Sequence, residues 1–169
     1  SKALSHFAWG RYLQQQKPGD MEAYADEFHK ALQLFPSSKR ILAALSRPLL
    51  AREKYGKLVD YIQPIAEANP ENPRLQLLVA DLLKKQERLQ EVIDHLENVV
   101  KKSSEPSPQV VRQLAVYFWQ NEAYDKSVKL YRQMVNRRSA REQIGMWLSA
   151  ARFNYSRARL VKESELSNK

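Results

Sequence analysis

The sequence predicts an all-α solenoid of about four helix-turn-helix repeats, followed by one further helix. Three observations support this prediction. An apolar pattern with helical spacing recurs about every 34 residues, a small residue recurs at one place in the preceding helix, and the 169-residue chain contains only four glycines. A recurrence of this length is typical of stacked helical units, and scarce glycine argues against a fold rich in β-hairpins.

The second helix of each repeat carries the clearest recurrence. Its apolar residues keep the spacing of one helix face in four segments, and only Ser127 interrupts the set with a polar side chain. Because 43% of the chain is hydrophobic, chance does not explain this agreement. The positions are Met21, Tyr24, Ala25, Phe28, Ala31 and Leu32; Tyr55, Leu58, Val59, Ile62, Ile65 and Ala66; Leu89, Val92, Ile93, Leu96, Val99 and Val100; and Tyr124, Ser127, Val128, Tyr131, Met134 and Val135.

The first helix of each repeat is marked by a large, a small and a second large residue. The small residue lets two helix backbones approach closely. Pro36 and Pro70 mark the ends of two repeats, because proline cannot continue a helix interior, and Ser104 and Ser139 hold the same place in the other two. The recurring residues are Trp9, Gly10 and Leu13; Leu45, Ser46 and Leu49; Val79, Ala80 and Leu83; and Leu114, Ala115 and Phe118.

These signals order the elements along a single domain that covers residues 1–169. Neighbouring pairs are expected to stack into a right-handed superhelix. A C-terminal helix at about 140–162 either caps the stack or begins a fifth repeat. The repeats are 3–36, 37–70, 71–106 and 107–139, with helix pairs at 3–16 and 20–34, 39–53 and 55–68, 73–86 and 88–102, and 107–120 and 123–137.

The pattern also predicts the core and two exceptions to local rules. Pro48 and Pro64 fall inside expected helices, where a proline costs about 3 kcal/mol. Either packing absorbs the kink, or the kink changes the superhelix and shapes a groove. The expected core residues are Trp9, Leu13, Phe28, Leu45, Leu49, Ile62, Val79, Leu83, Leu96, Leu114, Phe118 and Tyr131.

The first-helix segments HFAWGRYL, LAALSRPL, QLLVADLL and VRQLAVYF keep their spacing in register. Over about residues 3–139, the chain resembles the tetratricopeptide repeat (TPR) family, whose first helix reads W-x2-L-G-x2-Y. The leading Trp is absent, and Tyr24, Leu58, Val92 and Ser127 stand where the second helix usually has Ala. The resemblance implies a helical solenoid that serves protein–protein interaction.

No reaction centre is visible in the sequence. The chain has no cysteine, which excludes disulfides and thiolate sites. His6, His29 and His95 have no partner at a familiar metal-ligand spacing, and neither a glycine-rich phosphate loop nor a serine elbow is present. We therefore expect no enzyme activity, no cofactor and no metal site.

The net charge of +9 favours acidic partners. By segment, the net charge is 0 for residues 1–36, +3 for 37–70, −1 for 71–106, +4 for 107–139 and +3 for 140–169. The excess therefore lies in the second repeat and in the last two segments.

The TPR resemblance implies that first-helix residues line a concave groove. Arginine there suits carboxylates, because its planar fork donates two parallel hydrogen bonds. Two interpretations stay open: a groove for an acidic ligand, or a basic protein with basic residues on every exposed face. The groove residues carried over by register are Arg11, Arg40, Arg47, Arg74, Lys84, Arg112, Gln113 and Trp119, with Gln14, Asp81 and Lys85 beside them.

Some family ligands are not expected. The carboxylate clamp that holds chaperone C-termini would need Lys and Asn where this chain has Phe7, Arg11, Ala44, Arg74 and Leu78. We predict a protein-interaction scaffold that binds a peptide or partner protein, with acidic ones favoured. The alternative is nucleic acid or another polyanion on the basic surface.

The sequence does not determine the compartment or the oligomeric state. No apolar run approaches the roughly 18 residues of a membrane span. The chain begins SKALSHFAW, without Met. We expect a soluble piece of a longer protein, from the cytoplasm or a bacterial periplasm.

Overall fold

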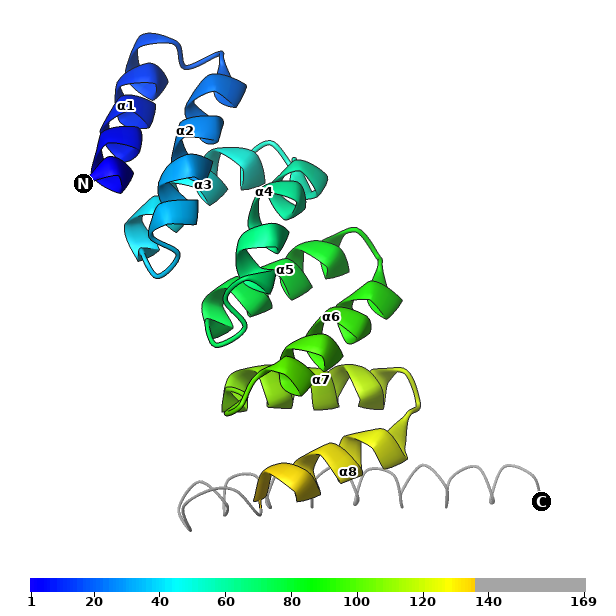
Figure 1. Cartoon of the computed structure of the whole chain (residues 1–169). Helices are drawn as coiled ribbons and strands as arrows, with labels where there is room; N and C mark the ends of the chain where they lie inside the picture. The colour runs from blue at the N-terminus through cyan, green and yellow to red at the C-terminus, as the bar shows by residue number, and fades with distance from the viewer. Residues whose placement is uncertain (136–169) are drawn as a thin grey trace, which may run out of the picture. The chain divides into compact units, whose positions relative to one another are not determined.

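The computed structural model describes residues 1–135, and the part it describes is all helical (Figure 1). The predicted all-α class is confirmed, while the helix expected at 140–162 lies outside the described residues, as does 136–139. The helices are α1 (Lys2–Gln16), α2 (Met21–Leu34), α3 (Lys39–Leu50), α4 (Tyr55–Glu67), α5 (Pro73–Lys85), α6 (Leu89–Lys102), α7 (Pro108–Gln120) and α8 (Tyr124–Val135).

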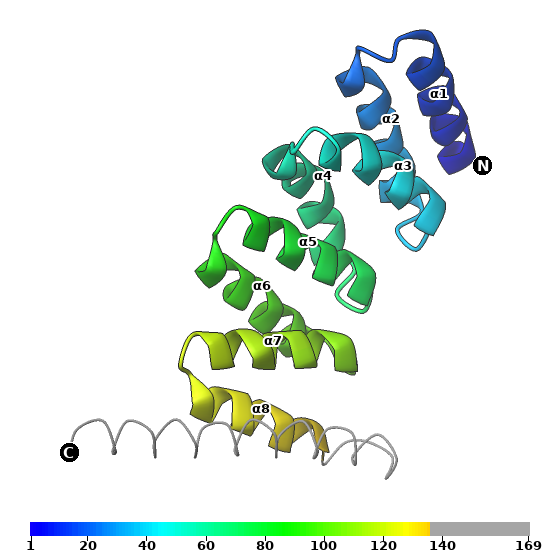
Figure 2. The same cartoon turned by 180° about the vertical axis from the view of Figure 1, so that it is seen from behind.

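The helices belong to two compact units, Ser1–Glu105 with α1 to α6 and a second unit that begins at Pro106. In the first unit each helix packs against the next one in the chain, and α2 also contacts α4. Figures 1 and 2 show α1 and α2 side by side from opposite directions. In the second unit α7 packs against α8. We call α1, α3 and α5 the first helices and α2, α4 and α6 the second helices.

Most of the predicted core is buried. Leu13 is only half-buried, and the side chain of Tyr131 lies outside what the structure describes. The buried residues of the predicted set are Phe28, Leu45, Leu49, Ile62, Val79, Leu83, Leu96, Leu114 and Phe118.

The prediction for Trp9 was wrong, because its side chain is 53% exposed. Its counterparts Leu45 and Val79 lie on α3 and α5, which each pack against the preceding second helix. Among the described helices, α1 packs extensively against α2 alone, and Gly10 rather than Trp9 faces Phe28 of α2. Trp9 instead stacks on Tyr12, with ring centroids 5.2 Å apart.

The recurring small residues lie at close contacts, as expected. A Cβ added to Gly10 would lie 2.7 Å from a ring carbon of Phe28. Ala80 and Ala115 are completely buried. Ser46 is buried as well, and its hydroxyl donates to the carbonyl of Leu42 at 2.7 Å. The small position therefore sets how closely two helices approach.

A residue in the left-handed conformation follows α3, α5 and α7. Glu53, Glu87 and Glu122 have φ of 53°, 60° and 58°. The next residue donates back to a carbonyl in the helix, as Arg88 does to Leu83 at 3.1 Å, and this is the Schellman pattern of C-capping. It ends α3 at Leu50, earlier than the predicted residue 53.

The two helical prolines lie close to helix ends. α3 continues only to Leu50 after Pro48, and α4 only to Glu67 after Pro64. Each proline lacks the N–H that would bond the carbonyl four residues earlier, Ala44 for Pro48 and Asp60 for Pro64, so each helix gives up one hydrogen bond near its end. The possibility that a proline kink shapes a groove is not tested by the structure.

Buried polar side chains tie neighbouring helices together. Gln76, which is fully buried, donates to the carbonyls of Ala66 at 2.7 Å and Asn69 at 2.9 Å. These carbonyls lie at and just beyond the end of α4, and each also accepts a backbone N–H, from Asn69 and from Asn72 respectively. The Ser127 hydroxyl donates to the carbonyl of Ala115 at 3.1 Å, which explains why a polar residue is accepted in that apolar position.

Candidate functional site

Charge in the first unit is segregated by helix. The first helices carry eight basic residues and one acidic residue, Asp81. The second helices carry four basic and eight acidic residues. Each repeat mixes one helix of each kind, so counting charge by repeat hides this difference. A count by helix would have revealed it from the sequence.

Ion pairing follows the same division. The second helices hold pairs such as Glu22 with Lys57, Glu27 with Lys30 at 2.6 Å, and Glu97 with Lys101 at 3.1 Å. Lys30 and His6 lower the pKa of Glu27. By contrast, Arg40, Arg47 and Arg74 on the first helices form no ion pair with any residue of 1–135. Their charge is therefore left for solvent or a ligand. On the second helices, much of the charge is already neutralised by ion pairs within the protein.

The predicted arginines of the first unit are all exposed. Arg40 lies over the ring of Phe7 on α1, 5.3 Å from its centroid, so this contact bridges two first helices. Arg47 lies two turns further along the same side of α3. Arg11 donates to Gln14 at 2.8 Å, and Arg74 is the second residue of α5. We give the name first-helix surface to these exposed arginines and two exposed lysines of α5, namely Arg11, Arg40, Arg47, Arg74, Lys84 and Lys85.

The other predicted residues belong to the second unit. Arg112 is exposed on α7, whereas Gln113 and Trp119 are half-buried. The Trp119 ring meets Tyr124 edge-on, with centroids 4.5 Å apart. The structure brings Trp119 to α8 within its own unit. That all eight predicted residues line one groove stays a prediction.

An apolar pocket of about 550 Å³ lies where the start of α1, the end of α2 and the start of α3 meet. Sequence reasoning missed it, although Leu34 and Phe35 precede the repeat-ending Pro36. The equivalent places hold Ala68 and Asn69 in the second repeat. The pocket is lined by Leu4, Phe7, Leu34, Phe35, Ile41, Ala3, Ser1, Lys2, Ser38 and Arg40.

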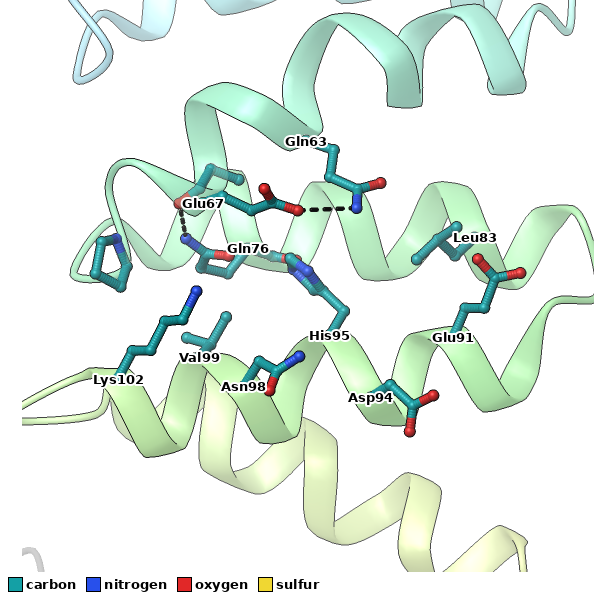
Figure 3. Close-up of a pocket in the computed structure, with 12 residues that line it drawn as sticks. Gln63, Glu67, Gln76, Leu83, Glu91, Asp94, His95, Asn98, Val99 and Lys102 are labelled. Atoms are coloured by element: carbon teal, nitrogen blue, oxygen red, sulfur yellow. Dashed lines mark hydrogen bonds between the residues drawn. The ribbon is translucent and has the colours of Figure 1, made fainter.

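A second, polar pocket of about 280 Å³ lies between α4, α5 and α6 (Figure 3). Gln63 donates to Glu67 at 3.0 Å along one side, and the carboxylate of Glu91 is held by Arg88 at 2.6 Å. Its wall comes largely from second helices, so it has the opposite charge preference to the first-helix surface. The main polar lining residues are Gln63, Glu67, Gln76, Glu91, Asp94, His95, Asn98 and Lys102.

Each histidine has a partner within the protein. His6 Nδ1 lies 2.7 Å from a carboxylate oxygen of Glu27, and His29 Nε2 lies 2.8 Å from the Gln33 amide. His95 Nε2 donates to the carbonyl of Gln76 at 3.2 Å. Burial lowers the pKa of His29 and of His95. These contacts give the histidines a role in packing.

Two further properties concern residues 1–135 alone. There, no three His, Asp or Glu side chains gather into a metal-binding group. None of the helices in this part combines the length and the apolar character that crossing a membrane requires.

Comparison with known proteins shows the fold. No family model matches the sequence, and no curated protein matches it. Among solved structures, a kinesin-light-chain-type protein of Podosopora anserina with nearly identical TPR-like repeats is 17% identical, with 97% of this chain and 90% of that chain covered and a TM-score of 0.51. The first-helix and second-helix pairs of this chain thus follow the TPR arrangement that the sequence resembles.

Two further solved structures give the same result. The structure of MamA is 12% identical, with a TM-score of 0.50 and coverage of 98% of this chain and 94% of that one. The Pseudomonas aeruginosa protein PilF is 16% identical, with a TM-score of 0.50 and coverage of 100% and 83%. The predicted TPR-like α-solenoid is therefore confirmed as the fold.

Proposed function

We propose that this TPR-like solenoid is a protein-interaction scaffold that binds an acidic segment of a partner protein on its first-helix surface. Repeat solenoids present extended surfaces for such contacts. In the TPR arrangement the first helices line the concave side, where an extended segment can touch several repeats. The observation that carries the proposal is the segregation of charge between first and second helices.

The arginines favour a carboxylate ligand for a specific reason. Arg40, Arg47 and Arg74 have no acidic partner within residues 1–135, so binding a carboxylate breaks no existing ion pair. A guanidinium donates two parallel hydrogen bonds to a carboxylate, and such charge-assisted bonds are stronger than neutral ones. A scaffold of this kind gains both affinity and orientation from a few acidic residues.

The test is a titration followed by fluorescence anisotropy. The probe is a labelled peptide of alternating glutamate and leucine, with a glutamine-for-glutamate version as its neutral control. We expect the acidic peptide to bind and the neutral one to bind far more weakly. Replacing both Arg47 and Arg74 with alanine should weaken peptide binding. The loss of binding free energy should be about 1.5–3 kcal/mol for each arginine whose hydrogen bond to the peptide is shielded from water. It should be about 0–1 kcal/mol for each arginine whose ion pair with the peptide is solvated.

A matched control separates the surface from the net charge. Lys57→Ala with Lys101→Ala removes the same two charges from second helices, and it should leave the affinity for the acidic peptide nearly unchanged. Equal losses in both double variants would sink the proposal, because binding would then follow net charge alone. Tighter binding of a single-stranded oligonucleotide than of the peptide would favour the polyanion alternative instead.

A further inference from the structure

We infer that the apolar pocket at the meeting point of α1, α2 and α3 takes one bulky apolar side chain of the acidic segment. This inference rests on the proposed function and makes it more specific. The preferred partner sequence then has a leucine, methionine or phenylalanine with a glutamate or aspartate one or two positions away. The pocket determines where on the first-helix surface that segment is anchored.

The pocket gathers apolar side chains that a soluble protein normally covers. Leu4 is 65% exposed, and Leu34 and Phe35 are each 53% exposed. All three line the pocket, together with Phe7 and Ile41. Large contiguous apolar patches on a protein surface mark interaction sites, and a volume of about 550 Å³ lies in the usual range of about 300–1,000 Å³ for ligand pockets.

Basic residues at two helix starts determine the sign of the occupant's charge. α3 begins with Lys39 and Arg40, and α1 begins with Lys2, with no acidic residue in either first turn. The start of a helix carries positive partial charge, so cations there are unfavourable for the helix itself. Their placement does not serve helix stability. An anionic ligand beside the pocket would relieve the repulsion.

Arg40 links the pocket to the rest of the first-helix surface. It lines the pocket, lies over Phe7 at 5.3 Å from the ring centroid, and has no ion pair within residues 1–135. Contact with the ring holds the guanidinium at the edge of the apolar site. An extended segment advances about 3.3 Å per residue, so a carboxylate near Arg40 lies one or two residues from the side chain in the pocket.

The test compares two labelled peptides on the full chain. Both are glutamate-rich and identical except at one central position, which is leucine in one and serine in the other. We expect the leucine peptide to bind at least tenfold more tightly. The double variant Leu34→Ser, Phe35→Ser should reduce this preference to less than threefold while it still binds the serine peptide. Equal affinities of wild-type protein for both peptides would overturn the inference and leave the proposed function intact.

Control variants and a sedimentation experiment distinguish the remaining explanations. Trp9→Ser with Tyr12→Ser removes exposed aromatic surface outside the pocket, and it should keep the preference for leucine. Leu4→Ser is a second pocket variant in case the double variant loses its helical circular dichroism. Failure of both peptides to bind would remove the proposed function as well. Sedimentation without peptide, showing self-association that the pocket variants abolish, would assign the pocket to a second copy and refute the inference.

Discussion

Gly10 and Gly19 respond differently to the same added methyl group. Phe28, the neighbour of Gly10, is completely buried, so its ring has little room to move away from a new Cβ at 2.7 Å. Gly19 has nothing within 4 Å of the corresponding place. At the residue scale, the packing of α1 against α2 therefore depends on the absence of one carbon atom.

We expect Gly10→Ala to destabilise the protein despite the better helix propensity of alanine. Overpacking costs about 1–3 kcal/mol, whereas replacing a mid-helix glycine gains only about 0.5–1 kcal/mol. Gly19→Ala should be neutral or stabilising by about 0.4–1 kcal/mol. Urea unfolding followed by circular dichroism measures both. A Gly10→Ala variant as stable as wild type would show that the two helices do not meet closely at Phe28.

His95 makes stability depend on pH. Burial lowers its pKa from 6.5, so the unfolded chain takes up a proton at a higher pH than the folded protein does. Stability is then full above pH 6.5 and falls as the pH drops below that value. The lowered pKa values of Glu27 and Glu91 start from 4.5, so these carboxyls titrate below this window.

The melting temperature should fall between pH 7 and pH 5.5, and it should fall less in His95→Gln. Glutamine keeps a donor for the Gln76 carbonyl and cannot take up a proton. Some dependence should remain, because burial lowers the pKa of His29 as well. An equally steep decline in wild type and variant would assign the effect to other groups.

At the scale of the element, glutamate recurs where glycine is the usual choice. Glu53, Glu87 and Glu122 all adopt positive φ just after α3, α5 and α7. A left-handed conformation costs an L-residue roughly 1–2 kcal/mol, while glycine adopts it freely. The turn hydrogen bonds, such as Glu87 N–H to the Lys84 carbonyl at 2.9 Å, hold the strained residue in place.

Glu87→Gly should therefore stabilise the protein by about 1 kcal/mol, the relieved strain less about 0.5–1 kcal/mol of glycine entropy. Glu87→Ala serves as the control, because alanine removes the charge but keeps the strain. Thermal unfolding of the two variants gives the comparison. A gain shared by both would mean that charge, not backbone conformation, limits stability at this turn.

The elements were largely predictable because helical spacing is a local property. α6 runs to Lys102, where the apolar pattern placed its end. The prediction that Trp9 is buried was wrong because burial depends on which helices pack around α1, and within residues 1–135 its extensive packing is against α2 alone. The apolar pocket was missed because Leu34 and Phe35 lie outside the repeating pattern and meet Leu4 only in three dimensions. The arginine positions followed from register, whereas their lack of ion pairs needed coordinates.

At the scale of the whole molecule, the largest feature is the division of charge between two sets of helices in the first unit. The first helices carry eight basic residues and one acidic residue, and the second helices carry four basic and eight acidic residues, so we expect the first unit to have an electric dipole. The net charge of +9 describes attraction at long range. The dipole describes the direction of that attraction at shorter range, within about 10 Å in 0.1 M salt.

This separation of charge has a consequence for the speed of encounter. If an acidic segment binds as proposed, one that approaches the second helices should be repelled, and the resulting torque should turn the protein before contact. This steering raises the association rate, and salt screens it. The association rate should therefore drop steeply as salt rises from 50 to 300 mM, while the dissociation rate changes little. Stopped-flow mixing with the acidic peptide measures both rates. A salt effect confined to the dissociation rate would mean that the charges stabilise the bound complex but do not steer the encounter.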